Sequence, residues 1–355
     1  MEQKRYLRIL ERITETDDTV TFRLEAADGQ PFIYQPGQYV TLIFEVNGHE
    51  KRRAYSFSSS PATDAQPSIT IKRIPNGEFS TRLLGHAIPG DLLLTTEANG
   101  RFLLPSPWPA ILCYLAAGSG ITPVISHLKT LLAADAATFG HRKILLFYAN
   151  RDSRSTIGKA QLDRWMEAYP DRFECVYFFS REKNAEHARF RHLNNGLLEQ
   201  ELRRYFGGHV NARHRAQTHF YFCAPPALTR MGRMTLRQMD FPEENFHLEA
   251  FMPERVSTKR LPDTTHTHHI VAQWPTQRLE FQIYEGETIL DGALRQGIAL
   301  PYSCQVGVCL SCLARCVHGQ VEVEFAQVTQ LGKPGDLINT CLGYAATETV
   351  EIAYG

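Results

Sequence analysis

The sequence predicts a chain of three parts: a small antiparallel β-barrel, a parallel α/β sheet, and a second β-rich part with one helix. Alternating apolar and polar residues, separated by turns with Gly and Pro, fill residues 1–105 and are typical of a barrel. Continuous apolar runs such as "AILCYLAAG" alternate with helical patterns over residues 106–252, which predicts a parallel sheet covered by helices. Strand patterns return in residues 266–355, around the helical segment "TILDGALRQG".

The segment between the second and third parts reads as a linker. Residues 253–265, "PERVSTKRLPDTT", are rich in Pro, Thr and charge and show no periodicity. The run "HTHH", residues 266–269, follows directly. A metal site is one interpretation of this run, but no carboxylate or Cys partner stands nearby, so we interpret it as the beginning of a strand.

Charge and hydropathy restrict the function classes. The chain of 355 residues has a net charge of zero, which gives no general attraction to nucleic acid. Residues 266–355 nevertheless carry four basic and nine acidic side chains, a net charge of −5, and the remainder carries +5. This asymmetry indicates either complementary docking surfaces or chance clustering. No apolar run approaches the length of a membrane span and the N-terminus has no apolar signal core, so we expect a cytoplasmic protein.

Most of the eight cysteines crowd the last part of the chain. Cys304, Cys309 and Cys312 have C-x4-C-x2-C spacing, and Cys341 follows 29 positions later. This spacing is typical of four thiolates that hold a plant-type [2Fe–2S] cluster, because ferric iron favours charged sulfur ligands in tetrahedral geometry. A structural zinc site is the alternative, although zinc usually takes two C-x-x-C pairs. Cys316 does not fit the ligand spacing, and we expect it to be a buried thiol.

Two longer segments surround these cysteines. They are "ETILDGALRQGIALPYSCQVGVCLSC" and "LINTCLGYA". Both resemble the cluster-binding segments of plant-type ferredoxin domains. The resemblance implies a β-grasp fold of the α+β class for residues 266–355, with Cys304, Cys309, Cys312 and Cys341 as the iron ligands.

The barrel part contains "RRAYSFSSSP", residues 52–61, and then "NGEFS", residues 76–80. The first resembles the R-x-Y-S flavin signature of the ferredoxin–NADP reductase superfamily, and the second resembles its G-x-x-S phosphate-binding turn. A guanidinium can bind a pyrophosphate, an aromatic ring can stack on a flavin, and backbone amides can hold a diphosphate. The resemblance favours FAD over FMN and implies cofactor contacts from Arg53, Tyr55, Ser56, Gly77, Phe79 and Ser80.

The α/β part contains "LAAGSGITP", in which glycines follow an apolar strand and precede a helix. Such a turn lets the backbone approach a dinucleotide pyrophosphate, and proline suits the first helical turn. Further along, "FCAPPAL" resembles the C-G-P-x-x-M segment of the same superfamily, although Ala224 replaces the usual Gly and Leu228 the usual Met. The predicted nucleotide contacts are Gly118, Gly120, Thr122, Pro123, Cys223 and Pro225.

Two strand ends complete the predicted nucleotide site. In "VYFFSREKN", Ser180 and Arg181 resemble the pair that holds the adenosine 2′-phosphate in NADP-preferring relatives, which favours NADPH over NADH. In "NFHLEAF", Glu249 and Phe251 resemble the terminal acidic–aromatic pair near the flavin. Core packing is the alternative for Phe251, and a purely structural role is the alternative for Cys223.

The order of the three parts resembles the reductase components of multicomponent oxygenases. The resemblance implies an oxidoreductase that passes electrons from NADPH or NADH through FAD and [2Fe–2S] to a partner oxygenase. Ser56, Cys223 and Glu249 are the residues expected around the hydride path. Other acceptors stay open, namely a steroid or alkane hydroxylase, a desaturase or a hybrid-cluster protein. A redox-sensing flavin reductase is a further alternative. Neither a nucleic-acid partner nor a membrane span is expected.

Overall fold

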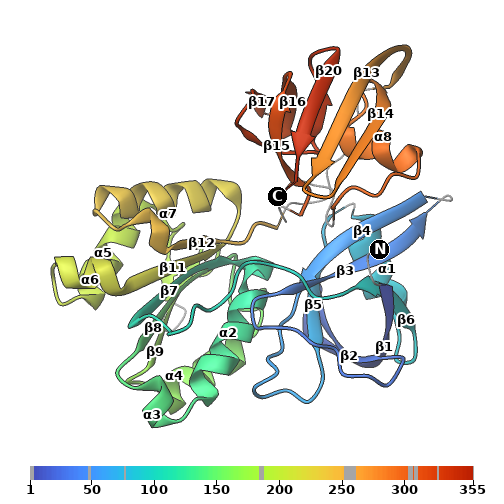
Figure 1. Cartoon of the computed structure of the whole chain (residues 1–355). Helices are drawn as coiled ribbons and strands as arrows, with labels where there is room; N and C mark the ends of the chain where they lie inside the picture. The colour runs from blue at the N-terminus through green and yellow to red at the C-terminus, as the bar shows by residue number, and fades with distance from the viewer. Residues whose placement is uncertain are drawn as a thin grey trace. The chain divides into compact units, whose positions relative to one another are not determined.

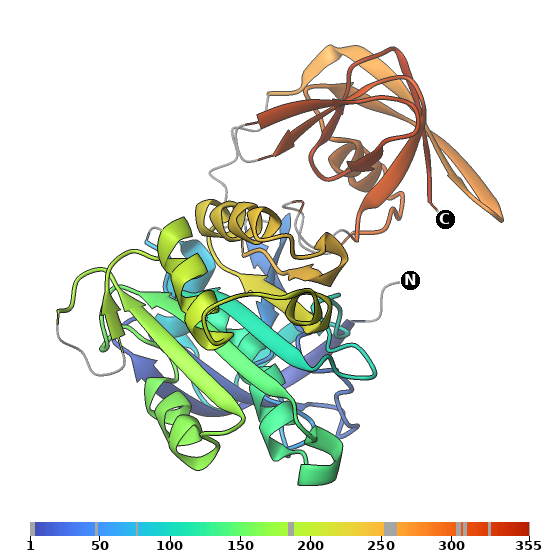
Figure 2. The same cartoon turned by 90° about the vertical axis from the view of Figure 1, so that its left-hand side faces the viewer.

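A computed structural model describes residues 4–46, 49–75, 77–183, 188–251, 261–302, 307, 311–325 and 328–354. The chain divides into two compact units, Gln3–Phe251 and Met252–Gly355, and each is described by itself (Figures 1 and 2). The first unit contains both the predicted barrel and the predicted parallel sheet. No helix among the described residues is long and apolar enough to cross a membrane.

The N-terminal half of the first unit is an antiparallel six-stranded sheet in the order β4-β3-β6-β1-β2-β5. A bridge between Phe57, just after β4, and Ile69 in β5 brings the two edge strands together, as a barrel requires. Inward-facing apolar side chains of the strands and of the helix α1 form its core. The elements are β1 (Lys4–Thr16), β2 (Thr19–Ala26), β3 (Tyr39–Val46), β4 (His49–Ser56), β5 (Ser68–Lys72), α1 (Glu78–His86) and β6 (Leu92–Thr96).

The second half of this unit is a parallel six-stranded sheet in the order β10-β9-β8-β7-β11-β12. Its strands are β7 (Ile111–Ala117), β8 (Lys143–Asn150), β9 (Phe173–Phe179), β10 (Ala188–Phe190), β11 (Thr218–Cys223) and β12 (Phe246–Leu248). Its helices are the 3₁₀ turn η1 (Gly118–Gly120), α2 (Ile121–Ala133), α3 (Ala136–Phe139), α4 (Lys159–Ala168), α5 (Asn195–Tyr205), α6 (Ala212–Gln217), α7 (Pro226–Gln238) and the 3₁₀ turn η2 (Glu243–Asn245).

The apolar runs of these strands are continuous because helices cover both faces of the sheet (Figure 1). Along β7, Leu112 and Tyr114 face the core that includes α2 and α4, whereas Cys113 and Leu115 face the core that includes α5 and α7. Strand order reverses between β7 and β11, since the chain adds β8 to β10 on one side and then crosses to the other. Ligands of open α/β sheets bind in the crevice at such a switch point.

The second unit contains a five-stranded sheet, β14-β13-β20-β15-β18, and a three-stranded sheet, β17-β16-β19. Apolar side chains of α8 and of both sheets share one core. The elements are β13 (Asp263–Trp274), β14 (Gln277–Glu285), α8 (Ile289–Arg295), β15 (Leu313–His318), β16 (Val321–Phe325), β17 (Val328–Gly332), β18 (Leu337–Asn339), β19 (Gly343–Ala345) and β20 (Thr349–Ala353). The antiparallel barrel, the parallel sheet and this α+β unit confirm the predicted fold class.

The predicted linker and the His run can be compared with these elements. Of the predicted linker, residues 253–260 lie outside the described residues, and β13 already begins at Asp263. The run at 266–269 lies within β13, where His268 Nε2 is 2.5 Å from Glu285 and His269 Nε2 is 3.4 Å from Glu280. Among the described residues, no group of three or more His, Cys, Asp or Glu side chains is arranged to hold a metal ion.

Candidate functional site

The predicted flavin signature lies on β4 and at its end. Arg53 and Tyr55 are two positions apart in this strand, so their side chains leave the same face. The Arg53 guanidinium lies 4.7 Å from the centre of the Phe79 ring, and its Nη1 donates to the Arg52 carbonyl at 2.6 Å. Phe79 is itself buried in the barrel core. The structure therefore brings Arg53 against the first turn of α1, where the phosphate-binding turn is predicted.

Ser56 ends β4 with a buried side chain that is only 2% exposed. Its Oγ makes no hydrogen bond to any residue that the structure describes. A buried hydroxyl without a partner costs about 1–3 kcal/mol, so native proteins rarely leave one unless a ligand or water completes it. The buried Ser56 hydroxyl at the end of β4 could therefore bind a polar group of a ligand, such as the edge of a flavin.

The segment before α1 is closely packed around Gly77, the N-terminal cap of the helix. A Cβ at Gly77 would lie 2.8 Å from Ser80 Oγ and 2.9 Å from Ile74 Cβ, so only glycine fits without displacement. Ser80 is buried, and its Oγ accepts a hydrogen bond from the Ile74 backbone amide at 3.0 Å. Gly77 has no side chain to cap α1, and the backbone amides of a helix N-terminus suit an anionic diphosphate.

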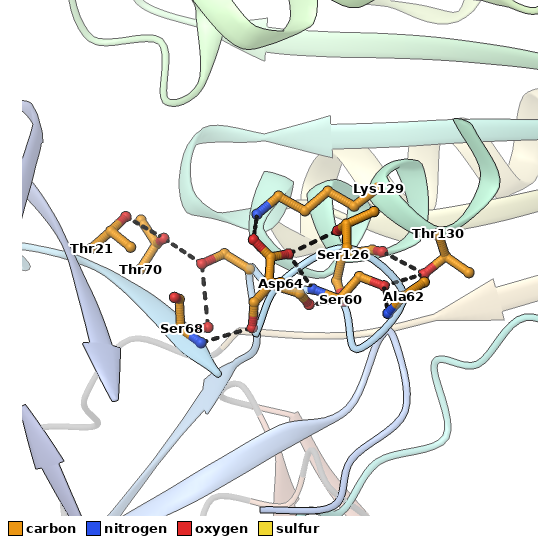
Figure 3. A network of polar contacts seen from close by, with 12 residues as sticks. Thr21, Ser60, Ala62, Asp64, Ser68, Thr70, Ser126, Lys129 and Thr130 are labelled. Carbon is orange, nitrogen blue, oxygen red and sulfur yellow. Dashed lines mark hydrogen bonds and ion pairs between the residues drawn. The ribbon is translucent and has the colours of Figure 1, made fainter. Parts of the chain in front are cut away.

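A polar network joins the segment after Ser56 to α2, the helix of the predicted nucleotide turn (Figure 3). Ser126 Oγ donates to the Ser59 carbonyl at 2.5 Å, and the Ser60 and Thr130 hydroxyls are 2.7 Å apart. Lys129 Nζ binds Asp64 Oδ1 at 2.9 Å. Because these contacts cross between the barrel and the parallel sheet, they hold the two predicted cofactor segments in a fixed relation within the first unit.

The predicted nucleotide turn lies at the switch point between β7 and β11. Gly118 has φ of +52°, a conformation that favours glycine, and its carbonyl accepts a hydrogen bond from the Tyr148 hydroxyl at 3.0 Å. A Cβ at Gly120 would lie 1.9 Å from the Cys223 carbonyl oxygen and 3.2 Å from Cys223 Sγ. The turn and the end of β11 are therefore in direct backbone contact, which requires glycine at position 120.

Thr122 and Pro123 lie in the first turn of the helix α2, and both are buried. Thr122 Oγ1 donates to the Ser119 carbonyl at 3.0 Å, which stabilises the turn. Pro123 stands in the first helical turn, where its missing N–H removes no intrahelical hydrogen bond. This local structure leads the chain from an apolar strand into a helix N-terminus, as a dinucleotide site requires.

The structure brings Cys223 and Glu249 to the same edge of the parallel sheet. The Glu249 backbone amide donates to the Phe222 carbonyl at 2.9 Å, immediately before Cys223. Burial raises the pKa of the Cys223 thiol well above its usual range, and the Glu249 carboxylate raises it further, so the thiol stays neutral. Pro225 caps the N-terminus of α7. Phe251 is partly buried and packs against the core on the α2 side of the sheet. This packing agrees with the alternative role of Phe251 as a core residue.

A cavity of 290 Å³ lies beside the end of β9. Its lining includes Ser180 together with Arg191 and His192, which the sequence analysis did not single out. Arg181 does not line the cavity, although its backbone amide bonds to the Arg151 carbonyl at 2.8 Å. The only sequence signal for the two missed residues is the basic pair in "ARFRHL" shortly after the Ser-Arg pair.

The two described cluster cysteines lie together in the second unit. Cys312 Sγ and Cys341 Sγ are 3.2 Å apart, beyond the ~2.05 Å of a disulfide. Two thiolates on one tetrahedral metal stand about 3.8 Å apart when the metal–sulfur bond is about 2.3 Å. If the two Sγ atoms moved apart by about 0.6 Å, both could therefore bind the same iron. A Cβ at Gly307 would lie 2.1 Å from Leu342 Cδ1, so Gly307 lies directly against the residue after Cys341. These observations fit an iron–sulfur cluster.

Cys304 and Cys309 lie outside the described residues. Cys316, expected to be a buried thiol, is fully buried, and its Sγ lies 3.6 Å from the His318 and Gly319 carbonyl oxygens. Burial raises the pKa of this thiol, and Asp336 raises it further.

Family models match all three parts of the chain. An oxidoreductase FAD-binding domain matches residues 6–102, an oxidoreductase NAD-binding domain residues 114–233, and a 2Fe-2S iron-sulfur cluster binding domain residues 274–346. These matches confirm FAD, a pyridine nucleotide and a [2Fe–2S] cluster as the cofactors.

Relatives match over most of their length. One of the subunits of 1,2-phenylacetyl-CoA epoxidase from Escherichia coli is 29% identical over 317 residues, covering 88% of this chain and 86% of the relative. The ferredoxin reductase component of 3-ketosteroid-9-alpha-monooxygenase from Rhodococcus rhodochrous is 30% identical over 330 residues, covering 89% and 87%. The structure of phthalate dioxygenase reductase has the same fold, with a TM-score of 0.61 and 19% identity over 99% of this chain and 98% of that one.

The three domains, in this order, confirm the resemblance drawn from the motifs. The chain therefore belongs to the family of NAD(P)H-dependent oxidoreductases that join FAD-binding, NAD-binding and [2Fe–2S] domains in one polypeptide, the family of the 3-ketosteroid-9-alpha-monooxygenase ferredoxin reductase component.

Proposed function

We propose that this chain is the reductase component of a multicomponent oxygenase and that it uses NADPH as its electron donor. When bound, FAD accepts a hydride from the nicotinamide, and the [2Fe–2S] cluster carries the electrons onward one at a time. The observation that best supports the nucleotide-binding part of this proposal is the backbone contact between Gly120 and Cys223, beside the nucleotide turn. The names of the relatives, which include components of epoxidases and monooxygenases, favour an oxygenase as the acceptor.

The flavin would be held by the barrel domain. We assign the pyrophosphate to the Arg53 guanidinium and to the backbone amides that follow Gly77 at the start of α1. Phe79 would hold Arg53 in place from below, and Ser80 would fix the turn through its bond to Ile74. Tyr55 would supply the ring that stacks on the flavin, because it leaves the same face of β4 as Arg53.

The hydride path would pass Ser56, Cys223 and Glu249. Ser56 would offer its unpartnered hydroxyl to the reactive edge of the flavin, where a proton must be held or moved. Cys223 would remain a neutral thiol beside the nicotinamide and exclude water from it. Gly118, Gly120, Thr122, Pro123 and Pro225 would shape the backbone around the nucleotide, and Phe251 would close the edge of this site.

Ser56→Ala tests the flavin side of the path. We expect the NADPH-dependent rate of flavin reduction to fall about tenfold, as for the loss of one hydrogen bond of ~1.4 kcal/mol, with flavin content unchanged. Stopped-flow absorbance measures this rate. Ser58→Ala is the matched control, because the Ser58 hydroxyl already accepts from Thr70 Oγ1 at 2.7 Å. Equal rates in the wild type and Ser56→Ala would contradict the role of Ser56.

The cavity beside β9 supports NADPH over NADH. Ser180, Arg191 and His192 offer a hydroxyl, a cation and an imidazole to a phosphate dianion, and an Arg binds phosphate strongly. Glu182 is the acidic residue that could instead have bound the ribose diol of NADH. Its carboxylate accepts a hydrogen bond from the Ser153 backbone amide at 2.6 Å, so it is already engaged elsewhere. Arg181 would add positive charge nearby.

Arg191→Ala tests the donor preference. We expect KM for NADPH to rise about ten- to hundredfold, since a charge-assisted bond contributes roughly 1.5–3 kcal/mol, whereas KM for NADH should stay unchanged. Steady-state reduction of cytochrome c with each nucleotide gives both values. Arg189→Ala is the control, because Arg189 pairs with Glu201 at 2.9 Å instead of lining the cavity. An equal rise for both nucleotides would argue against 2′-phosphate recognition.

The cluster would be held by Cys304, Cys309, Cys312 and Cys341 in the second unit. We also propose a cytoplasmic location, since the thiolates that hold such a cluster must be kept reduced. The function as a whole is tested by reconstitution: the purified holoprotein with NADPH should support turnover by an oxygenase component of the same organism. Reduction of the cluster without any oxygenase turnover would contradict the oxygenase as acceptor and leave only the electron-transfer function.

A further inference from the structure

The C-terminal strand of the second unit places a tyrosine beside the cluster cysteines. Strands β15 and β20 are antiparallel, with Arg315 opposite Ala353 and Cys316 opposite Ile352. Continuing this register sets Tyr354 opposite Ala314, so Cys312 is its diagonal neighbour. An aromatic side chain can reach such a neighbour across a strand pair. Ala314 presents only a methyl group, which leaves room for the tyrosine ring.

Burial confirms that these side chains share one face. Cys312, Ala314 and Tyr354 all belong to the same apolar core, which also contains Cys341. The Tyr354 ring stacks on the Trp274 ring, with centroids 4.8 Å apart and an interplanar angle of 20°. The Tyr354 backbone amide also donates to the Gln273 carbonyl at 2.8 Å. Both the ring plane and the backbone of Tyr354 are therefore fixed.

The Tyr354 hydroxyl is the unexplained group at this place. Tyr354 is 8% exposed, and its hydroxyl makes no hydrogen bond among the described residues. The Thr340 Oγ1 donates to the Cys312 carbonyl at 3.1 Å. A phenol is protonated at neutral pH, so the buried Tyr354 hydroxyl can act as a donor.

We propose that, when Cys312 and Cys341 hold the [2Fe–2S] cluster, the Tyr354 hydroxyl donates a hydrogen bond to a sulfide of the cluster and thereby raises its reduction potential. Hydrogen bonds to cluster sulfurs stabilise the more electron-rich reduced state, so they set the potential. Tyr354 would thus act on the reduction potential of the cluster, so that electrons move onto the cluster more readily. It would not contact the flavin or the nucleotide. The inference rests on the proposed ligation of the cluster by these cysteines.

A redox titration of the full-length holoprotein tests this role in the Tyr354→Phe variant. At a fixed ambient potential, the ratio of reduced to oxidised cluster should fall about tenfold, equal to a lower midpoint by about 59 mV for a one-electron couple. The flavin midpoint should not change and serves as an internal reference. Tyr284→Phe is the matched control, because Tyr284 lies on β14 opposite Thr267, at the other side of the sheet.

An unchanged cluster midpoint in Tyr354→Phe, or an equal shift in Tyr284→Phe, overturns the proposal. If Tyr354→Phe does not retain iron, replacing Tyr354 by 3,5-difluorotyrosine decides instead. That residue keeps the shape and is a stronger donor, so the midpoint should rise, and an unchanged or lower midpoint overturns the proposal. Failure of the wild type to bind a cluster, or of NADPH to reduce it, would contradict the proposed function, which is a different result.

Discussion

Gly120→Ala is expected to lower kcat/KM for NADPH about 100-fold, or ~2.7 kcal/mol of transition-state stabilisation. The added Cβ would lie 1.9 Å from the Cys223 carbonyl oxygen and 2.7 Å from its carbonyl carbon. Neither backbone atom can rotate away, so β11 and the nucleotide turn must separate. This separation moves Cys223 and the start of α2 at the same time. Stopped-flow reduction of the flavin at varied NADPH concentration measures the effect.

The matched control for this prediction is Gly196→Ala in α5. A Cβ there would meet only Asn194 Oδ1, at 3.7 Å, which is ordinary van der Waals contact. We expect normal kinetics for Gly196→Ala and normal flavin content for both variants, because the flavin contacts lie in the barrel. Normal NADPH kinetics in a folded Gly120→Ala protein would show that the close contact with Cys223 is not needed for nucleotide binding.

Cys341→Ala is expected to abolish the [2Fe–2S] absorbance and the reduction of one-electron acceptors that depends on the cluster. The cluster cannot complete tetrahedral coordination of both irons with three thiolates. NADPH should still reduce the flavin, because the residues proposed for that step lie in the first unit. Iron and labile sulfide content, visible spectra and stopped-flow flavin reduction distinguish these effects.

Cys316→Ala is the control for the ligand set. Cys316 is as deeply buried as Cys312, yet its Sγ faces the His318 and Gly319 carbonyls. We expect the cluster to be retained, with a loss of ~1 kcal/mol in the free energy of unfolding from the small cavity. Loss of the cluster in Cys316→Ala, or its retention in Cys341→Ala, would mean that the spacing assigns the wrong fourth cysteine.

Much of this protein could be predicted from short segments, because their chemistry is local. A buried parallel strand must be apolar throughout, so "AILCYLAAG" indicates the covered sheet and the glycines after it indicate the turn. Three cysteines within nine positions indicate a cluster loop, because one loop must surround the metal. Ser180 follows a recognisable apolar strand and does line the cavity, whereas Arg191 and His192 are marked only by a short basic pair that belongs to no known binding motif.

The sequence by itself thus determined the three domains, their order and the cofactor classes, since each depends on residues that are neighbours in the chain. Only the tertiary structure decided which distant residues meet. It brings the Gly120 turn into contact with Cys223 and lets the Glu182 carboxylate accept a hydrogen bond from the Ser153 amide. It also places Tyr354 diagonally across from Cys312. The physical reason is that strand order and register arise from packing of the whole core, and a shift of one residue would turn each side chain to the opposite face.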